Sequence, residues 1–390
     1  MRHFRKILAE LYIAVTLTFI IDGQTYRRGG ANELDSMHIR ELAETLGVST
    51  RAIRFYEEQS LVRPRKHPGN GYRLYGPKDV RRLQTVISLR EVGMTIEEIR
   101  GVLERWDEGD EDEVQHALEL KRSVMFAQFV ELLHNIKATD RMIERMKRGE
   151  SAATETWFET AKELRALKAL RANWRDHWNF DRQAEVHDDL TLHGRDSWNR
   201  HPSYLHTLRS IVDWVRPRKG ERGLDAGVGT GNLAGLFVAE GIDMAGVDQS
   251  KMMLKRCNAK FPSVETKLGN FLAIPYLDHT FDFIVSSYAL HHLTDEQKRL
   301  ALDEMRRVAK PHGRICLADL MFEDEGHRTA YLDRLREQGQ DERIGWIERH
   351  FFADRSALLD WFEREGYVVK TKAIHEILHL IYAVPARISY

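Results

Sequence analysis

A glycine-rich turn at Gly227, Gly229 and Gly231, just after a short apolar run that ends at Asp225, places the tightest limit on the fold of this chain. Glycine has no Cβ and tolerates positive φ, so such a turn lets the backbone pass sharply from a strand into a helix and approach a ligand closely. This arrangement is typical of a parallel α/β sheet that binds a nucleotide-like cofactor. A dinucleotide is disfavoured, because its G-x-G-x-x-G pattern requires glycine where Asn232 stands.

Strand-like and helical patterns alternate around this turn from about residue 174 onward. Apolar runs predict five strands, at residues 222–226, 243–247, 265–268, 281–286 and 314–318. A closing hairpin is predicted from residues 367–371 and 373–384. This order predicts a doubly wound, Rossmann-like α/β sheet with the hairpin at its edge. Asp248 ends the second strand, where a carboxylate accepts hydrogen bonds from ribose hydroxyls, and the third strand runs into Asn270 and Phe271.

The acidic residue and the G-x-G-x-G turn resemble motif I of the class I S-adenosylmethionine-dependent methyltransferases, and the resemblance extends over about residues 175–385. Within that class, the chain looks most like small-molecule methyltransferases of the ubiquinone-biosynthesis-like group. The resemblance implies S-adenosylmethionine as the cofactor and a small molecule as the methyl acceptor. It assigns cofactor binding to Asp225, Gly227, Gly229, Gly231, Asp248, Gln249, Asn270 and Phe271.

Two histidines, His291 and His292, lie just past the fourth strand, at the sheet edge where active sites form. Either is a candidate catalytic base, because a hydroxyl or a protonated amine must lose a proton before it accepts a methyl group; lining of the pocket is the alternative role. Residues 286–289 read Ser-Ser-Tyr-Ala rather than Asn/Asp-Pro-Pro-Tyr, which argues against methylation of DNA bases. We expect four aromatic residues to pack in the core rather than to line the acceptor pocket: Trp174, Trp178, Trp198 and Tyr204.

A second pattern lies far N-terminal of the glycine turn. Apolar residues at helical spacing end at Gly47, and Ser49 is a good N-cap, so residues 37–58 predict a helix-turn-helix unit whose second helix enters the DNA major groove. Turn residues at 68–71 predict a β-hairpin wing. Residues 48–82 include nine basic and three acidic residues, as expected of a phosphate-binding surface. The candidate DNA contacts are Thr50, Arg51, Arg54, Tyr56, Tyr72, Arg73 and Tyr75.

Three motifs within residues 37–104 resemble the MerR family of transcriptional regulators: Arg54-Phe-Tyr-Glu57, Gly71-Tyr-Arg-Leu-Tyr75 and residues 90–99. A long helical pattern follows, with an apolar stripe at heptad a/d spacing from Met125 to Met146. The resemblance implies that this helix pairs two subunits in an antiparallel coiled coil, and that the homodimer binds an inverted-repeat operator in double-stranded DNA. The alternative is that the stripe packs within its own chain.

Charge and cysteine content exclude several other classes. The 59 Lys and Arg residues nearly balance 60 Asp and Glu, and no apolar run reaches the ~20 residues that span a bilayer. Cys257 and Cys316 are too few for a disulfide framework or a zinc site, and neither follows the long helix, where metal sensors of the MerR family carry cysteines. We therefore expect a cytoplasmic protein with no metal site and no membrane partner.

The expected organisation is a tail at residues 1–36, a DNA-binding domain at 37–110, a dimerisation helix at 111–148, a linker or helix at 149–173 and a methyltransferase-like domain at 174–390. The predicted function is that of a DNA-binding transcriptional regulator that methylates a small molecule. The alternative is a transcription factor whose methyltransferase-like domain only senses S-adenosylmethionine, S-adenosylhomocysteine or another small ligand.

Overall fold

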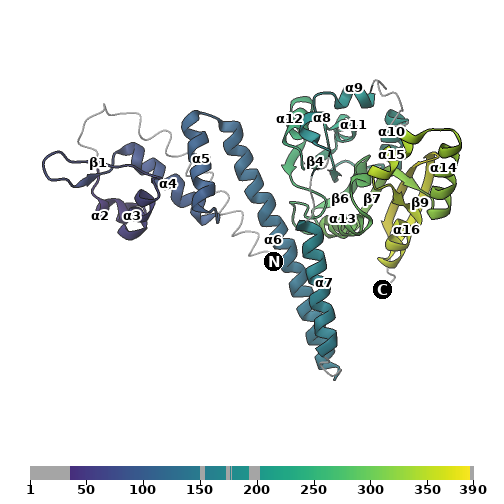
Figure 1. Cartoon of the computed structure of the whole chain (residues 1–390), viewed down its shortest axis with the longest axis horizontal. Helices are drawn as coiled ribbons and strands as arrows, with labels where there is room; N and C mark the ends of the chain where they lie inside the picture. The colour runs from purple at the N-terminus through teal and green to yellow at the C-terminus, as the bar shows by residue number, and fades with distance from the viewer. Residues whose placement is uncertain (1–35, 150–153, 173–175, 177, 193–202, 387–390) are drawn as a thin grey trace. The chain divides into compact units, whose positions relative to one another are not determined.

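The computed structural model describes residues 36–149, 154–172, 176, 178–192 and 203–386, and it divides the chain into two compact units between Val114 and Gln115 (Figure 1). The expected tail lies outside the described residues, apart from residue 36. Of the helices within the described ranges, none is long and apolar enough to cross a membrane.

The N-terminal unit is a helix-turn-helix followed by a small wing and two further helices. Its elements are α2 (Ile39–Thr45), α3 (Thr50–Glu58), β1 (Arg65–Lys66), β2 (Arg73–Leu74), α4 (Pro77–Glu91) and α5 (Ile96–Glu108). Gly47 makes the turn between α2 and α3 at a φ of 63°, and the Ser49 side chain caps α3 by accepting the N–H of Ala52. Leu42 and Ile53 are fully buried in the small core between these helices. The predicted helix-turn-helix and wing are therefore present.

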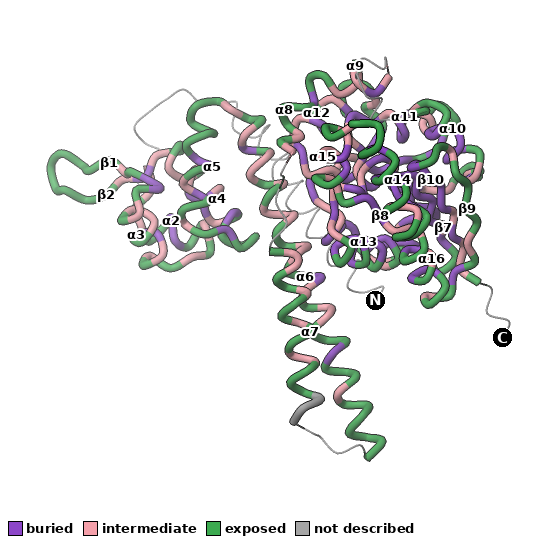
Figure 2. The backbone as a smooth tube through the Cα atoms, turned by 45° about the vertical axis from the view of Figure 1, so that its right-hand side comes forward, coloured by how far each residue is buried: buried purple, intermediate pink, exposed green. Residues whose placement is uncertain are grey.

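The helix α6 (Glu111–Lys147) contains the boundary between the two units, and α7 (Thr154–Ala172) runs beside its later part (Figures 1 and 2). Nζ of Lys168 on α7 lies 3.0 Å from Oε1 of Glu131 on α6. Val130 and Ala138, on the same side of α6, are buried. The side of α6 that packs within this chain is therefore the one that carries Val130, Glu131 and Ala138.

The predicted a/d stripe lies on the opposite side of α6, because a helix turns by about 100° per residue. Five of its large apolar members are about half exposed in the single chain, and Phe129 is partly buried. The five are Met125, Leu132, Ile136, Ile143 and Met146. The described part of the chain does not bury this stripe, so the alternative of packing within one chain is not what the structure shows.

One eight-stranded sheet organises the C-terminal unit. Its strands are β3 (Arg222–Ala226), β4 (Asp243–Asp248), β5 (Glu265–Leu268), β6 (Phe281–Ser287), β7 (Ala309–Phe322), β8 (Ala353–Asp354), β9 (Tyr367–His375) and β10 (Leu378–Pro385). Their order is β5-β4-β3-β6-β7-β10-β9, with β8 paired to the end of β7; β3 to β7 run parallel, and β10 runs antiparallel to both its neighbours. The predicted doubly wound sheet and edge hairpin are present, but residues 373–375 belong to β9 rather than to the second hairpin strand.

Helices cover both faces of this sheet. They are α8 (Phe180–Gln183), α9 (His187–Leu192), α10 (Tyr204–Val215), α11 (Asn232–Ala239), α12 (Lys251–Lys260), α13 (Asp295–Val308), α14 (Glu325–Glu337), α15 (Asp341–Arg349) and α16 (Arg355–Arg364), with a short 3₁₀ turn, η2 (Leu290–His292). Ile284 packs in the core with α13 and α16, and Val285 packs in the core with α10, α11 and α12, as alternation along a strand requires. The chain crosses from β5 to β6, beside β3, so a topological switch point lies at the carboxyl ends of β3 and β6.

Candidate active site and nucleic-acid interface

The outer face of α3 presents the residues expected to contact DNA. Arg51 and Arg54 are exposed, whereas Ile53 is fully buried and anchors the inner face of the helix. Thr50, the first residue of α3, is half-buried, and Tyr56 packs its ring partly against the core. The helix therefore displays two cations on the side away from its own core, the arrangement that a recognition helix requires.

Glu57 joins the end of α3 to the wing. Its carboxylate accepts hydrogen bonds from Nε of Arg73, at 2.6 Å, and from the hydroxyl of Tyr75. Tyr75 is fully buried, and this burial, with the hydrogen bond to Glu57, raises the pKa of its phenol. The prediction that Tyr75 contacts phosphate is corrected here: its hydroxyl is turned inward and holds Glu57. Tyr72 is 66% exposed on the wing and Arg73 is also exposed, so both still face solvent.

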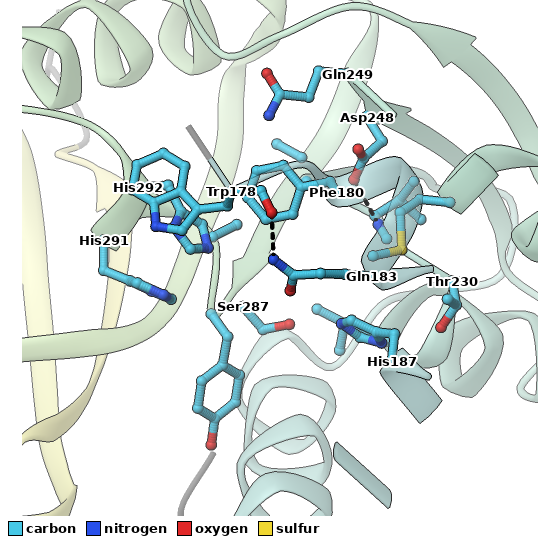
Figure 3. Close-up of a pocket in the computed structure, with 18 of the residues that line it drawn as sticks. Trp178, Phe180, Gln183, His187, Thr230, Asp248, Gln249, Ser287, His291 and His292 are labelled. Carbon is cyan, nitrogen blue, oxygen red and sulfur yellow. Dashed lines mark hydrogen bonds between the residues drawn. The ribbon is translucent and has the colours of Figure 1, made fainter. Parts of the chain in front are cut away.

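A cavity of about 260 Å³ lies at the carboxyl ends of β3, β4, β5 and β6 (Figure 3). Its volume is just below the ~300–1,000 Å³ of typical small-molecule sites, and it lies at the switch point, where ligands bind in open α/β sheets. Six of the eight residues predicted to bind cofactor line it: Gly227, Gly229, Asp248, Gln249, Asn270 and Phe271. The predicted bases His291 and His292 line the same cavity, on the side opposite Asp248.

The glycines of the β3–α11 turn serve different purposes. A Cβ on Gly227 would lie 2.6 Å from Cβ of Ala289, and one on Gly231 would lie 2.7 Å from Sγ of Cys257, so these two positions have no room for a side chain. Gly229 has a φ of 52° and no atom within 4 Å of the place of a Cβ. The loop therefore presents an open stretch of backbone to the cavity at Gly229, as predicted for a cofactor-binding turn.

Two carboxylates stand behind and beside this turn. Asp248 accepts the N–H of Gly229 on Oδ2 and the N–H of Ser250 on Oδ1, both at 2.9 Å, and burial raises its pKa. Asp225 is fully buried and does not line the cavity; Oδ2 accepts the N–H of Ala234, while Oδ1 has no hydrogen-bond partner among the described residues. Burial, with a smaller contribution from Asp248, raises the pKa of Asp225 to about 8.

The loop after β5 carries Asn270 and Phe271 into the cavity wall. Oδ1 of Asn270 accepts the N–H of Leu272 at 2.9 Å, so the amide carbonyl already holds its own loop together. An sp² oxygen has a second lone pair, which leaves room for one further donor. The half-buried ring of Phe271 lies against the turn, within 3.0 Å of the place of a Cβ on Gly227.

Two short helices, α8 and α9, line one side of the cavity and are called its cover. An aspartate fixes each of them to the sheet side. Oδ1 of Asp181, on α8, accepts a hydrogen bond from Oγ of Ser250 at 2.6 Å. Oδ1 of Asp188, on α9, accepts one from Oγ1 of Thr230 at 2.6 Å, and Oδ2 lies 2.7 Å from Nζ of Lys260. This part of the wall can therefore open only if these polar contacts break.

The far wall of the cavity is rich in aromatic rings. Trp178 lies 4.5 Å from His292 between ring centroids, and Tyr204 lies 5.3 Å from Tyr288. Trp178 and Tyr204 both line the cavity, contrary to the expectation that they pack only in the core. The other two aromatic residues of that expectation lie outside the described residues.

Sequence reasoning did not identify three residues at this wall. His350, directly after α15, and Trp346 line the cavity near His291 and His292. Asp319, buried on β7, lies 2.6 Å from Nδ1 of His291 through Oδ1. No local motif marks these positions, since each reaches the site through packing of an element distant in sequence.

Comparison with known proteins agrees with this geometry. Residues 37–106 match the MerR HTH family of regulatory proteins, and residues 224–317 match the methyltransferase domain family. A methyltransferase of Alkaliphilus oremlandii is 30% identical over 205 residues, which is 52% of this chain and 94% of that protein. A methyltransferase of Bacillus licheniformis is 36% identical over 191 residues, 49% of this chain and 88% of that protein.

A solved structure of Haemonchus contortus phosphoethanolamine N-methyltransferase 2, in complex with S-adenosyl-L-methionine, is 14% identical with a TM-score of 0.41, covering 54% of this chain and 60% of that one.

Proposed function

The chain belongs to the methyltransferase family through its C-terminal half and carries a MerR-type helix-turn-helix domain near its N-terminus. From this premise we propose that it is a DNA-binding regulator that methylates a small molecule with S-adenosylmethionine as donor. The observation that carries the proposal is the cavity at the switch point, where the glycine turn and Asp248 face a cluster of histidines.

The residues of the turn fit this donor. Asp248 lies at the end of β4, and each of its oxygens retains a lone pair beside the bond that it already accepts. Gly229 leaves backbone open to a ligand, and the buried Oδ1 of Asp225 favours a nearby cation, since a cation would stabilise its ionised form. When bound, S-adenosylmethionine would supply a methyl group on a positively charged sulfur. A nucleophile in line with the C–S bond would take the methyl carbon as that bond breaks and neutral S-adenosylhomocysteine leaves.

The opposite wall suits a small acceptor. His291 and His292 are placed to take or relay a proton from an acceptor group, and the aromatic rings of Trp178 and Trp346 limit access of water there. Residues 286–289, just after the core of β6, read Ser-Ser-Tyr-Ala and lack the Asn/Asp-Pro-Pro-Tyr pattern expected of enzymes that methylate nucleic-acid bases. The acceptor is therefore proposed to be a small molecule rather than the operator itself.

The DNA-binding half is proposed to act as a homodimer on an inverted repeat. Arg51 and Arg54 would lie in successive major grooves, with Arg73 and Tyr72 on the flanking phosphates. The exposed stripe of α6 supports dimer formation, since apolar side chains at a/d spacing gain most when a second helix covers them.

Calorimetric titration of the full chain with S-adenosylmethionine tests the donor. Asp248→Ala is expected to weaken binding by about 1.5–3 kcal/mol, roughly 10- to 150-fold, through loss of hydrogen bonds to a charged group. Asp243→Ala is the matched control: it lies at the other end of the same strand, exposed, and 3.2 Å from Arg222. Absence of binding at millimolar donor in the unaltered chain would remove the proposal.

Release of S-adenosylhomocysteine in the presence of candidate acceptors separates an enzyme from a sensor. An enzyme consumes the donor in proportion to acceptor, whereas a sensor binds the donor and changes operator affinity without turnover. A screen of small hydroxyl, thiol and amine compounds with methyl-labelled donor supplies this measurement.

A further inference from the structure

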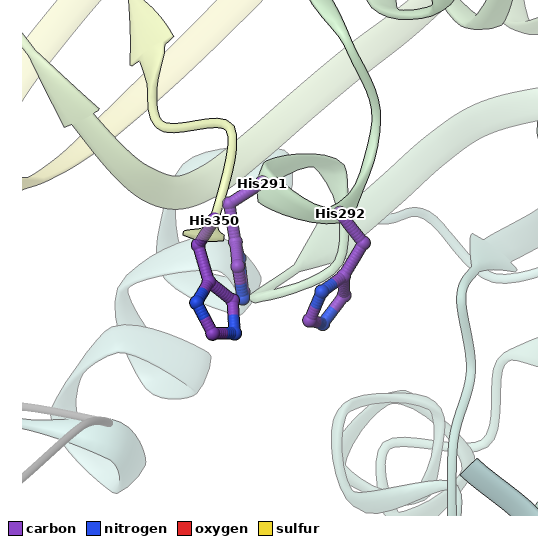
Figure 4. Close-up of side chains that lie close together, drawn as sticks. All are labelled: His291, His292 and His350. Carbon is purple, nitrogen blue, oxygen red and sulfur yellow. The ribbon is translucent and has the colours of Figure 1, made fainter. Parts of the chain in front are cut away.

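Three histidines converge at the acceptor end of the cavity (Figure 4). His291 and His292 come from η2, after β6, and His350 follows α15, so the three side chains reach this point from two separate parts of the fold. Each offers one ring nitrogen, and these nitrogens lie within 4.8 Å of one another. His291 is buried, and the other two are half-buried against the cavity.

Second partners fix the orientation of two of these rings. Nδ1 of His291 lies 2.6 Å from Oδ1 of Asp319, and Nδ1 of His350 lies 2.8 Å from the carbonyl oxygen of Trp346. Both partners are acceptors, so each Nδ1 carries the proton and donates it, which makes Nε2 the nitrogen with a lone pair. A carboxylate or a backbone carbonyl on the second nitrogen is the usual companion of a metal-binding histidine.

Asp319 is itself held rigidly. Its Oδ2 accepts the backbone N–H groups of Ala289 and Leu290, at 2.9 and 2.6 Å, and its Oδ1 also accepts the N–H of Leu320. The backbone N–H of Phe351 donates to the carbonyl of His291 at 2.9 Å, which ties the segment after His350 to η2. Backbone hydrogen bonds therefore hold Asp319 and the segment after His350 in place, and they fix the positions from which the histidine side chains extend.

We infer that His291, His292 and His350 form a binding site for a divalent first-row transition metal ion, with Zn²⁺ as the best match. A tetrahedral zinc site with Zn–N bonds of ~2.0–2.1 Å places its nitrogens ~3.4 Å apart, so small rotations of these rings complete it. Three imidazoles suit zinc, copper, iron or nickel, whereas magnesium and calcium prefer oxygen ligands. The expectation of no metal site took account only of cysteines, and could not foresee that His350 joins the pair.

Because all three histidines line the cavity, a fourth coordination position would face it. Catalytic zinc sites leave one position open in this way, whereas structural sites do not. This part of the inference rests on the proposed methyltransferase function, and it names the acceptor class: a small molecule with a hydroxyl or thiol that takes the open position. Coordination would lower the pKa of such a group, and its proton would pass to solvent, so in the metal-bound site the ion takes over from His291 and His292 the task of favouring loss of that proton. The aromatic rings of Trp178 and Trp346 beside the histidines favour an acceptor with an apolar or aromatic body.

Zinc titration of the tag-free, metal-stripped full chain, in competition with a chromophoric chelator, tests the site. One Zn²⁺ is expected per chain, and His350→Gln and His292→Gln are each expected to abolish tight binding. Asp319→Asn is expected to weaken it ~10- to 100-fold, because Asp319 positions His291 without touching the metal. His312→Gln, at an exposed position, is the matched control and should bind as the unaltered chain does.

Cobalt substitution supplies a signature that a purely structural role would not give. Co²⁺ in the site is expected to show the strong visible absorption of a tetrahedral ion, absent in His350→Gln. Calorimetry with S-adenosylmethionine checks that each variant is folded, since the donor site lies across the cavity.

Stoichiometric zinc binding that is unchanged in both His350→Gln and His292→Gln would overturn the inference, and so would absence of binding in the unaltered chain. If the unaltered chain instead fails to bind S-adenosylmethionine, the proposed methyltransferase function is overturned. The zinc titration then still tests whether the three histidines form a metal site.

Discussion

Asp225 should make the stability of the C-terminal unit depend on pH in an unusual direction. Its carboxyl is buried with one oxygen lacking a partner among the described residues, and burial raises its pKa from 3.8 to about 8. Between these two values the folded chain holds one proton more than the unfolded chain. The contribution of Asp225 to the free energy of unfolding is therefore greatest below about pH 4 and falls as pH rises toward 8.

The expected size follows from the shift. Each pH unit within the window costs a little over 1 kcal/mol, so from pH 5 to pH 7 the contribution falls by roughly 3 kcal/mol. Asp225→Asn removes the titration while it keeps an oxygen for the N–H of Ala234. The variant loses a fixed amount for its buried amide, and this loss does not change with pH.

Urea unfolding at a series of pH values, followed by tryptophan fluorescence, measures this difference. All tryptophans except Trp106 lie beyond the boundary at Val114, so fluorescence reports mainly on the C-terminal unit. The unfolding free energy of the wild type minus that of Asp225→Asn should decrease steadily from pH 5 to pH 7. Saturating S-adenosylmethionine should flatten the dependence, because a nearby cation favours the ionised carboxylate. A difference that is flat without ligand would mean that Asp225 is ionised throughout, and would refute the reasoning.

Two further predictions concern the cavity cover and the α6 stripe. Burial alone would raise the pKa of Asp188, but hydrogen bonds from His187 and Lys260, among others, hold that pKa well below its usual range. The contacts of Asp188 therefore persist at neutral pH and weaken only as pH falls below ~4. Asp188→Asn should speed amide exchange in α9 roughly 10-fold at pH 7, and unchanged exchange would show that other contacts hold the cover closed. Replacement of both Leu132 and Ile136 by Asp should give monomers by light scattering, and a persistent dimer would place the interface elsewhere.

The sheet and most of the cavity wall around the glycine turn, which is the proposed donor wall, could be predicted because their signals are local. Strands buried on both faces read as apolar runs, and Gly227, Asp248 and Asn270 follow such runs directly. Parallel strands bring their carboxyl ends to one edge, so residues far apart in sequence meet without any knowledge of packing. The hairpin turn was misplaced because Glu376 and Ile377 form it without glycine or proline.

The residues that were missed or misread depend on tertiary packing. His350 lies 59 positions beyond His291, and only the packing of α15 brings it to the cavity. The sequence around Tyr75 shows a hydroxyl-bearing aromatic residue in a basic wing. It does not show that this hydroxyl donates to the carboxylate of Glu57 instead of facing solvent. The sequence also left open which side of α6 packs within the chain. The a/d stripe marks one apolar side of the helix, but it does not reveal that a different side packs against α7.

A contact between α6, α7 and the donor wall offers a physical route for coupling the two proposed activities. Nη2 of Arg171, on α7, lies 3.2 Å from Nδ1 of His134 on α6, and its Nε donates to the carbonyl of Leu272 at 3.2 Å. Nδ1 of His134 also lies 2.8 Å from the carbonyl oxygen of Val130, to which it donates, so the guanidinium packs against this ring and does not donate to it. Burial lowers the pKa of His134, which favours the neutral ring beside this cation. Leu272 in turn donates to Asn270, which lines the cavity. A ligand that moves this loop therefore acts on α6 through one side chain.

Arg171→Gln should uncouple ligand and DNA binding while it leaves each in place. Coupling between two sites is reciprocal, so operator DNA must change donor affinity by the same factor, ~5- to 150-fold for ~1–3 kcal/mol, as the donor changes operator affinity. In Arg171→Gln both ratios should approach one. Lys168→Gln is the matched control, because Lys168 lies one turn away on α7 and pairs with Glu131 at the surface, without contact to the donor wall. Titration of each ligand with and without the other measures the ratios. Ratios in Arg171→Gln equal to those of the unaltered chain would exclude this contact as the route, and ratios of one in the unaltered chain would mean that the two activities share a chain without acting on each other.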